Sequence, residues 1–222
     1  MKAMILAAGR GERLRPLTER VPKPLVPVAG RPLLLHQLEW LAAAGLRDVV
    51  INLHHLGEQI VAAVGDGGAF GMRVQYSHEP TLLETGGGIV QALPLLGDET
   101  FLILNGDIYS DLPLDRLPAA LAPGVLGHLV VTPRPAFREH GDFEVEGGRI
   151  TGRGDRYVYC GIALLHPDAL AGRRAEPFSL RDVFFELLAA GRLSAQIWTG
   201  RWTDLGNLAQ LEALNAELAR TR

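Results

Sequence analysis

The sequence predicts an α/β fold: a Rossmann-like, mostly parallel sheet with helices on both faces and a small antiparallel elaboration. Short, continuously apolar stretches alternate with helical stretches in the first half of the chain, which is typical of βαβ units. The connections between these stretches are short, so successive strands are expected to lie parallel in one sheet. In the second half, strands are separated by glycine and proline, which favours antiparallel pairing.

Length and composition limit the fold and the class of partner. The 222 residues, of which 47% are hydrophobic, suit a single domain at 1–222 with a sizeable core. A formal net charge of −3 gives no general attraction to nucleic acid or to an anionic membrane. No uncharged apolar run reaches the roughly 18 residues of a membrane span. The only cysteine, Cys160, excludes an internal disulfide and fits a reducing compartment, so we expect a cytoplasmic protein.

The first half, residues 1–110, supplies the parallel strands and their helices. Buried strands are expected at 2–7, 48–53, 72–77 and 101–105. Helices are expected from Pro32 to Ala44 and over 56–68, and the segment 85–96 should begin as a loop and continue as a helix. Because ligands bind beyond the carboxyl ends of parallel strands, the segments 7–15, 79–88 and 105–107 should share one rim.

The second half, residues 111–222, supplies the elaboration. Strands are expected at 128–133, 142–150, 157–166 and 194–200, and helices at 179–190 and 207–219. The sequence Glu146-Gly147-Gly148 predicts a hairpin turn inside the second of these strand segments.

The loop after the first strand lacks the features of two common nucleotide fingerprints. Gly9 and Gly11 have G-x-G spacing, but Leu14 replaces the third glycine, and Pro16 follows where a helix should run. A Walker loop is excluded because the chain has no G-K-[ST] sequence. The remaining interpretation is a loop in which glycine lets backbone N–H groups approach an anion.

Lysine is scarce, and one lysine lies between two prolines. Only Lys2 and Lys23 are lysines among the 22 Lys and Arg residues. Pro22 and Pro24 fix their own φ and favour extended backbone around Lys23. We therefore expect Lys23 to reach outward as a positioned point charge, with a solvated basic loop as the alternative.

The stretch "AAGRGERLRPLTERVPKPLVPVAGRPL", residues 7–33, resembles the N-terminal signature of the sugar-1-phosphate nucleotidylyltransferases. In that family this loop wraps the triphosphate of a nucleoside triphosphate. The resemblance implies catalytic contacts to phosphate oxygens from Arg13 and Lys23. It implies nucleotide-binding roles for Ala7, Ala8, Gly9 and Gly11. The chemistry agrees, because attack of a sugar phosphate on the α-phosphorus joins two anions and calls for cations already in position.

Two aspartates match the family's metal ligands. Asp107 in "NGD" follows the strand predicted at 101–105, and Asp204 lies in "WTDLG". The resemblance implies that they hold Mg²⁺, which favours carboxylate, phosphate and water oxygens. Without the resemblance, Asp107 could be a turn residue and Asp204 the N-cap of the last helix.

The sequence "LETGGGI" resembles the family's base and ribose loop, with Glu84 where a glycine is common. The resemblance implies nucleotide contacts from Thr85 and Gly86, and a base-reading role for Glu79. A carboxylate accepts N–H donors, so Glu79 could accept from uracil N3 or from guanine N1 and N2. Glu79 therefore leaves the base open.

The segments "HGDF" and "YCGI" resemble the family's sugar pocket. We expect Asn105 and Asp142 to contact sugar hydroxyls and Gly161 to allow close approach. A later lysine that helps bind the sugar phosphate in larger relatives has no counterpart here. Either an arginine such as Arg153 replaces that lysine, or the metal and Lys23 suffice.

Over its whole length the chain most resembles the short uridylyltransferases that act on N-acetylmuramic acid 1-phosphate, a group of this family in cell-wall recycling. The resemblance implies two small-molecule substrates, UTP and that sugar phosphate, and a monomeric enzyme. A lactyl carboxylate on the sugar should pair with Arg134, Arg138 or Arg153. The alternatives are guanylyl transfer to mannose or heptose 1-phosphate and a non-catalytic nucleotide-sugar binding module.

Overall fold

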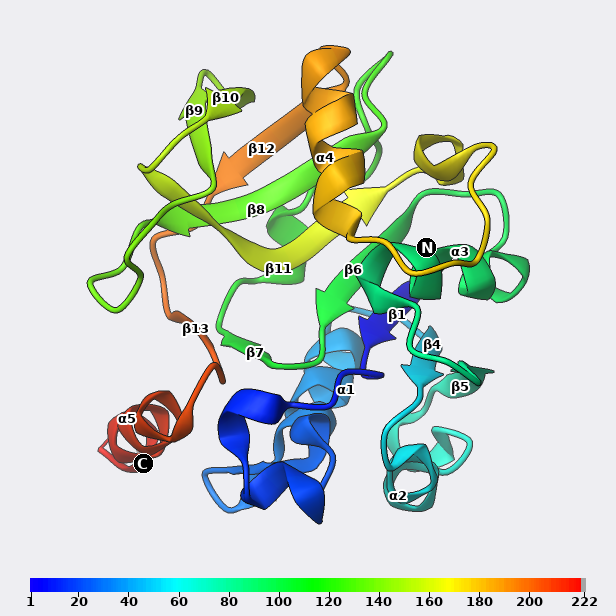
Figure 1. Cartoon of the computed structure of the whole chain (residues 1–222), viewed down its shortest axis with the longest axis vertical. Coiled ribbons are helices and arrows are strands. Elements are labelled where there is room, and N and C mark those ends of the chain that lie inside the picture. The colour runs from blue at the N-terminus through cyan, green and yellow to red at the C-terminus, as the bar shows by residue number, and fades with distance from the viewer. Residues whose placement is uncertain (221–222) are drawn as a thin grey trace.

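The structure is a computed structural model that describes residues 1–220 (Figure 1). The main strands are β1 (Ala3–Leu6), β4 (Asp48–Leu53), β5 (Arg73–His78), β6 (Phe101–Asn105), β8 (Gly127–Pro133), β9 (Phe143–Glu146), β10 (Arg149–Arg153), β11 (Tyr157–Leu165) and β12 (Leu193–Ile197). In the described part of the chain they form one sheet in the order β5-β4-β1-β6-β11-β8-β12-β10-β9. The strands from β5 to β6 are parallel, and β11 joins them antiparallel.

The remaining elements cover the sheet or extend from it. The α-helices are α1 (Leu33–Ala43), α2 (Gly57–Val64), α3 (Glu84–Leu96), α4 (Leu180–Ala189) and α5 (Leu208–Ala219). Short strand pairs are β2 (Pro27–Val28) with β3 (Arg31–Pro32), and β7 (Ile108–Ser110) with β13 (Trp202–Asp204). Single 3₁₀ turns are η1 (Glu12–Leu14), η2 (Leu17–Glu19), η3 (Lys23–Leu25), η4 (Gly68–Phe70), η5 (Leu114–Arg116) and η6 (Pro167–Leu170).

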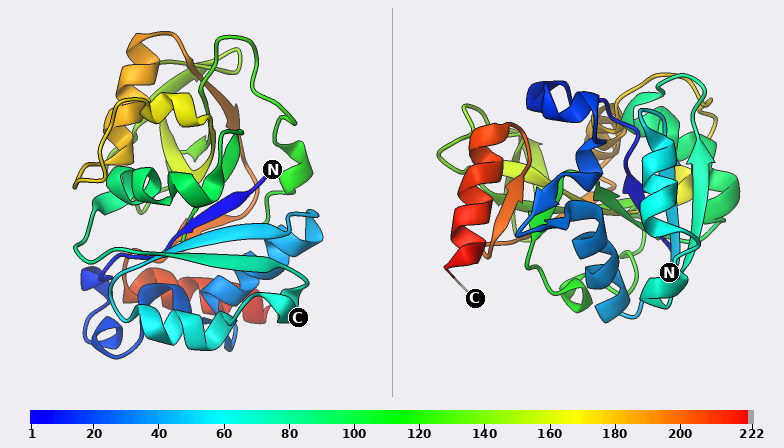
Figure 2. Two further views of the ribbon diagram at one scale, coloured as in Figure 1. Left: turned by 90° about the vertical axis from the view of Figure 1, so that its right-hand side faces the viewer. Right: turned by 90° about the horizontal axis from the view of Figure 1, so that it is seen from below.

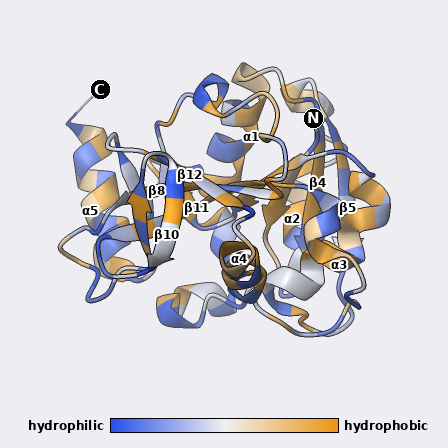
Figure 3. Cartoon of the chain, turned by 90° about the horizontal axis from the view of Figure 1, so that it is seen from above, coloured by the Kyte–Doolittle hydropathy of each residue, from blue (hydrophilic) through white to orange (hydrophobic). Residues whose placement is uncertain are grey.

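The alternation of side chains along the strands builds a core on each face of the sheet. On β1, Ala3 and Ile5 pack with α1 and α2, whereas Met4 between them packs with α3 and α4. Figure 2 shows helices on both sides of the sheet. Helices α3, α4 and α5 carry both hydrophobic and hydrophilic residues (Figure 3), as elements with one buried side should. The predicted α/β fold class is confirmed.

A third core cluster fixes the C-terminal helix against the N-terminal loop. Leu14 and Val26 of that loop pack with Leu211 and Leu214 of α5, and the Ala29 N–H donates to Asn215 Oδ1 at 2.6 Å. In Figure 1 the red helix α5 accordingly lies beside the blue N-terminal segment. The last residues before α5 are thereby brought to the rim that carries the N-terminal loop.

The predicted element bounds hold best in the parallel half. The strands predicted at 48–53 and 101–105 coincide with β4 and β6, and the hairpin turn at 146–148 separates β9 from β10. One pairing differs, because β12 lies parallel to β8 within the elaboration. Because β11 is antiparallel to β8, β12 also runs opposite to β11, and the chain reaches β12 from β11 through helix α4. No helix within residues 1–220 is long and apolar enough to cross a membrane.

Candidate active site

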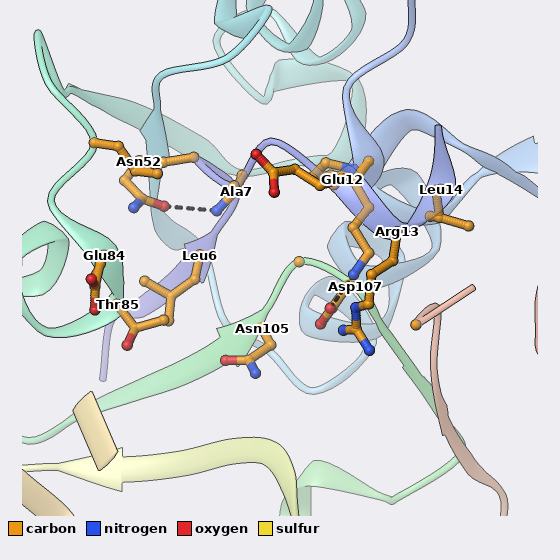
Figure 4. Close-up of a pocket in the computed structure, with 18 of the residues that line it drawn as sticks. Leu6, Ala7, Glu12, Arg13, Leu14, Asn52, Glu84, Thr85, Asn105 and Asp107 are labelled. Carbon is orange, nitrogen blue, oxygen red and sulfur yellow. Dashed lines mark hydrogen bonds and ion pairs between the residues drawn. The ribbon is translucent and has the colours of Figure 1, made fainter. Parts of the chain in front are cut away.

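A cavity of about 550 Å³ opens at the carboxyl ends of β1, β4 and β6 (Figure 4). Its lining includes these residues predicted from the sequence: Ala7, Ala8, Gly9, Gly11, Arg13, Lys23, Thr85, Asn105 and Asp107. Figure 4 shows Arg13 and Asp107 on one side of the cavity, and Glu84 and Thr85 on the other. The structure therefore brings the three predicted loops together on one rim.

The first loop uses its two glycines differently. Gly11 has φ +63°, and a Cβ there would lie 2.8 Å from Thr18 Cγ2, so only glycine fits without a shift. The Thr18 hydroxyl in turn donates to the Gly11 carbonyl at 2.8 Å. Gly9 has nothing within 4 Å of its Cβ position, which leaves open space beside the backbone. Gly11 shapes the loop, and Gly9 leaves room for a ligand.

Arg13 supplies a free positive charge at the cavity. Its side chain is exposed, and no hydrogen bond or ion pair engages its guanidinium within residues 1–220. Its Nη1 lies 3.2 Å from where a Cβ on Gly206 would be, so it borders the segment after β13. Such a guanidinium is available for phosphate oxygens.

Lys23 points inward rather than outward. It begins the turn η3, in which the Leu25 N–H donates to Pro22 O at 2.8 Å and the Val26 N–H to Lys23 O at 3.1 Å. The expectation of extended backbone at Lys23 was wrong, because these turn hydrogen bonds override the preference for extended residues before proline. The side chain is only 13% exposed, and its Nζ lies 2.5 Å from Asp107 Oδ2.

Asp107 and Asp204 lie on neighbouring backbone. Asp204 pairs with Ile108 in the β7–β13 ladder, and the Leu205 N–H donates to Asp107 O at 2.7 Å. Asp204 does not line the cavity itself, and its side chain is largely buried. Its Oδ1 accepts from Gln210 Nε2 at 2.7 Å.

Each of these carboxylates forms an ion pair with a basic side chain of the protein. Lys23 bonds to Asp107, and Arg138 Nη2 donates to Asp204 Oδ2 at 2.6 Å. The carboxylate in the turn before β7 and the carboxylate that ends β13 are thus neutralised from two different segments of the chain.

Gln37 of α1 positions the loop that carries Asp107. Its Nε2 donates to Asn105 O and to Ile108 O, each at 2.9 Å, and so bridges the backbone on both sides of Asp107. Gln37 was not among the residues predicted from the sequence. A signal was present, because Gln37 falls on the helix face of Leu34 and Leu41, where a polar residue is out of place.

Glu79 lies behind the cavity, and Asn52 faces it. Glu79 Oε1 accepts from Asn52 Nδ2 at 2.7 Å and Oε2 accepts from the Leu83 N–H at 2.9 Å, so both oxygens are engaged. Asn52 Oδ1 accepts from the Ala7 N–H at 2.7 Å (Figure 4). Asn52 was missed, although it is the next-to-last residue of buried strand β4, much as Asn105 is the last residue of β6. In this structure Glu79 holds Asn52 and does not reach the cavity.

The glycine triplet lies within a helix rather than in a loop. Helix α3 already begins at Glu84, so the predicted loop start at Thr85 was wrong. Thr85 lines the cavity, and its Oγ1 accepts from the Leu180 N–H at 2.8 Å. Gly86 is buried, and a Cβ there would lie 2.1 Å from the Phe178 ring. Gly86 therefore serves close packing of α3, outside the cavity lining.

The residues predicted for the sugar fall into two positions. Asn105 lines the cavity, and nothing within residues 1–220 hydrogen-bonds its side-chain amide. Gly161 has φ +72°, and a Cβ there would lie 2.9 Å from Asn105, so glycine makes room for that side chain. Asp142 lies outside the lining, where its Oδ2 accepts from the Tyr159 N–H at 2.9 Å.

The three candidate arginines have different surroundings. Arg134 Nη1 donates to the carbonyls of Arg138 and Glu139, each at 3.0 Å, which braces their loop. The Arg153 guanidinium carbon lies 4.4 Å from the centroid of the Phe185 ring. Arg138 alone of the three reaches a predicted metal ligand, Asp204.

Cys160 takes no part in this chemistry. It is buried in β11, and burial raises the pKa of its thiol well above the usual range, with a smaller contribution from the charge of Asp142. A thiol without thiolate character is a poor nucleophile.

Three comparisons with known proteins agree with this geometry. The nucleotidyl transferase family matches residues 2–123. The chain is 40% identical over 231 residues to an N-acetylmuramate alpha-1-phosphate uridylyltransferase of Neisseria meningitidis serogroup B, with 97% of both chains covered. It is 35% identical over 222 residues to the mannose-1-phosphate guanylyltransferase catalytic subunit beta of Danio rerio, covering 93% of this chain and 61% of that longer one. A Bacillus anthracis structure assigned as a glucose-1-phosphate thymidylyltransferase shares the fold, with a TM-score of 0.84, 21% identity and coverage of 100% and 96%.

Proposed function

Because the chain belongs to the nucleotidyl transferase family, we propose that it transfers a uridylyl group from UTP to N-acetylmuramic acid 1-phosphate. The coarser activity, that of a sugar-1-phosphate nucleotidyltransferase, follows from the family and its full-length relatives. UTP and the muramic acid acceptor are supported by the 40% identity over 97% of both chains to a uridylyltransferase of that name. The products are UDP-N-acetylmuramic acid and pyrophosphate.

The carboxylates suit Mg²⁺. Within residues 1–220 the structure groups no three His, Cys, Asp or Glu side chains around one metal position. Asp107, in the turn before β7, and Asp204, at the end of the paired strand β13, nevertheless match the one or two carboxylates with which Mg²⁺ usually binds alongside substrate phosphates. Their present partners are cations, which agrees with an anionic site that needs positive charge. When bound, Mg²⁺ would withdraw charge from the reacting phosphate oxygens.

The proposed reaction forms one bond and breaks one. An oxygen of the sugar phosphate attacks the α-phosphorus of UTP, and the bond from this phosphorus to the bridging oxygen breaks in line, so that its electron pair leaves with pyrophosphate. Arg13 and Lys23 neutralise the charge that gathers on the phosphate oxygens during this step. Lys23 is suited to this role because Asp107 and the turn η3 hold its ammonium group in place before substrate arrives.

The two halves of the single domain divide the substrates. We assign UTP to residues 1–110, with the triphosphate beside Gly9 and Gly11 and the uridine beside Asn52 and Thr85. Asn52 takes the base-facing place that the sequence suggested for Glu79, because Asn52 lines the cavity while Glu79 fixes its orientation. We assign the sugar to residues 111–222 and to the free amide of Asn105. Asp142 and Gly161 lie outside the cavity lining: Asp142 accepts from the Tyr159 N–H, and Gly161 leaves room for the Asn105 side chain.

One observation carries the proposal: a cavity of about 550 Å³ holds a free Arg13 and an ordered Lys23–Asp107 pair on one rim. A dehydrogenase needs no such pair, and a nucleotide-sugar binding module has no reacting phosphate to neutralise. We further propose a monomeric, cytoplasmic enzyme of peptidoglycan recycling that depends on Mg²⁺.

The test is product formation by the purified protein with Mg²⁺. UTP and GTP are each combined with N-acetylmuramic acid, N-acetylglucosamine, mannose and heptose 1-phosphates, and nucleotide sugars are identified by mass spectrometry. The proposal expects the highest kcat/KM for UTP with N-acetylmuramic acid 1-phosphate. Preferred turnover of GTP with mannose 1-phosphate would replace it with guanylyl transfer, an alternative that the Danio rerio relative supports.

A further inference from the structure

Arg138 forms an ion pair with Asp204, a carboxylate that the proposed function assigns to Mg²⁺. It lies on the loop between β8 and β9, and its Nη2 donates to Asp204 Oδ2 at 2.6 Å. The Asp204 side chain is 9% exposed, so this ion pair is largely shielded on the carboxylate side. A guanidinium and a divalent cation on the same carboxylate would repel each other, because both are positive.

The loop that delivers Arg138 is docked at the same place. The Phe137 ring stacks on Trp202, two residues before Asp204, with centroids 6.4 Å apart and planes 19° apart. Arg134 braces the loop from the other side through the carbonyls of Arg138 and Glu139. Phe137 is nevertheless 50% exposed, so this contact buries it only in part. The guanidinium is thus presented from the sugar half of the domain to the metal ligand.

The Arg138 fork is not satisfied by Asp204. Its Nε is buried and has no hydrogen-bond partner within residues 1–220. A guanidinium has five N–H donors in a planar fork that suits carboxylate and phosphate oxygens. A buried donor without a partner is costly, so the position favours a second anion.

We propose that Arg138 neutralises Asp204 until a divalent cation binds there, and that its released guanidinium then binds the anionic group of the acceptor sugar. The inference rests on the metal site of the proposed function. The acceptor anion is a phosphate or a carboxylate, which share the chemistry that a guanidinium fork recognises. Arg138 is chosen over Arg134 and Arg153 because those two hold loop carbonyls and the Phe185 ring.

The first readout is metal affinity without nucleotide or sugar. Mn²⁺ is titrated into the full-length protein and free Mn²⁺ is counted by electron paramagnetic resonance. Arg138→Gln should bind Mn²⁺ about two- to fivefold more tightly than the wild type, which is the range that a partly exposed ion pair supports. Arg138→Lys keeps the charge and should stay near the wild type. Arg73→Gln, which removes an exposed cation at the far edge of the sheet, should change nothing.

The second readout is the acceptor KM. Arg138→Gln should raise the KM for N-acetylmuramic acid 1-phosphate about tenfold, as loss of a charged hydrogen-bond partner should, while the KM for UTP stays within about twofold. An equal rise with N-acetylglucosamine 1-phosphate assigns the contact to the phosphate, which both sugars carry. A rise confined to the muramic acid substrate assigns the contact to its lactyl carboxylate.

The outcomes separate this inference from the proposed function. Equal Mn²⁺ affinity of Arg138→Gln and the wild type overturns the competition, and an unchanged acceptor KM overturns the second role. Asp204→Asn is measured beside them by the same titration. If it too leaves Mn²⁺ affinity unchanged, the metal assignment itself has failed, whereas an effect of Asp204→Asn alone rejects only the role of Arg138. Melting temperatures of all variants establish that each is folded.

Discussion

The two ion pairs at the site, Lys23–Asp107 and Arg138–Asp204, look alike but are built differently. Lys23 extends from a hydrogen-bonded turn and is 13% exposed, whereas Arg138 extends from a loop between two strands and is 37% exposed. Lys23 faces the cavity directly, and Asp204 lies behind its lining. This difference supports our proposals that Lys23 is held in place for the reacting phosphates and that Arg138 can leave Asp204.

The largest effect is expected when either carboxylate is removed, because its ion pair then loses the anion and the proposed metal loses a ligand. Asp107→Asn and Asp204→Asn should each abolish Mg²⁺-dependent turnover, since the proposed metal would lose one of only two protein ligands. Steady-state assays with UTP and the acceptor measure this, and melting curves control for folding. Retained activity in Asp204→Asn would contradict the role of Asp204 as a metal ligand and leave Asp107 as the only proposed protein ligand of Mg²⁺.

The next effect distinguishes the two cations. Lys23→Ala should lower kcat on the order of a hundredfold or more, as the loss of a transition-state contact does. Arg138→Gln should instead act on the acceptor KM. The measurement is a side-by-side determination of kcat and KM for both substrates. Near-normal turnover of Lys23→Ala would return Lys23 to a solvated basic loop.

A smaller effect is expected at Gln37, which holds the backbone on both sides of Asp107 in the Lys23–Asp107 pair. Gln37→Leu leaves the carbonyls of Asn105 and Ile108 without their donor, which should cost about 1–3 kcal/mol of unfolding free energy. It should also lower kcat about tenfold with little change in KM, because Asp107 is displaced from Lys23 by a fraction of an ångström. Urea unfolding and steady-state kinetics measure the two effects.

Gln59 supplies the matched control for this variant. Its Nε2 also donates to a backbone carbonyl, that of Arg20, but at an exposed position away from the cavity. Gln59→Leu should change neither kcat nor stability appreciably. Equal losses in both variants would mean that Gln37 acts through the fold in general and not through Asp107.

The smallest effect lies outside both pairs and concerns pH. Burial lowers the pKa of His128, against a weaker raising effect of its hydrogen bond to Gln196. The unfolded chain therefore takes up a proton before the folded one does, so the free energy of unfolding should fall as the pH drops below about 6.5. His128→Gln should flatten this slope in urea titrations between pH 7.5 and 5. An unchanged slope would assign acid sensitivity to other groups.

The parallel half of the fold could be predicted from the sequence because its signals are local. The runs at 48–53 and 101–105 are continuously apolar, and both strands begin and end where the pattern does. The β7–β13 pair was missed because each strand has three residues and their partners lie far apart in the chain. Short, non-local pairing leaves no periodic pattern to read.

The site residues, too, were predictable only where the signal is local. The positions of Arg13, Lys23 and Asp107 in the cavity could be predicted because each lies in a contiguous sequence motif. The Glu79–Asn52 bond and the Arg138–Asp204 pair could not, because each joins segments that only the folded sheet brings together. At Lys23 the local rule for residues before proline gave the wrong backbone, since the hydrogen bonds of η3 decide the conformation.

The central claim, that this cavity binds UTP, is tested most directly by thermal shift. UTP, GTP, dTTP and CTP are each added with Mg²⁺ to the wild type and to Arg13→Ala, since bound ligand raises stability as RT ln(1 + [L]/Kd). We expect UTP to raise the melting temperature of the wild type most, and Arg13→Ala to lose most of that rise. A larger rise with GTP, or no rise with any nucleotide, would contradict the claim.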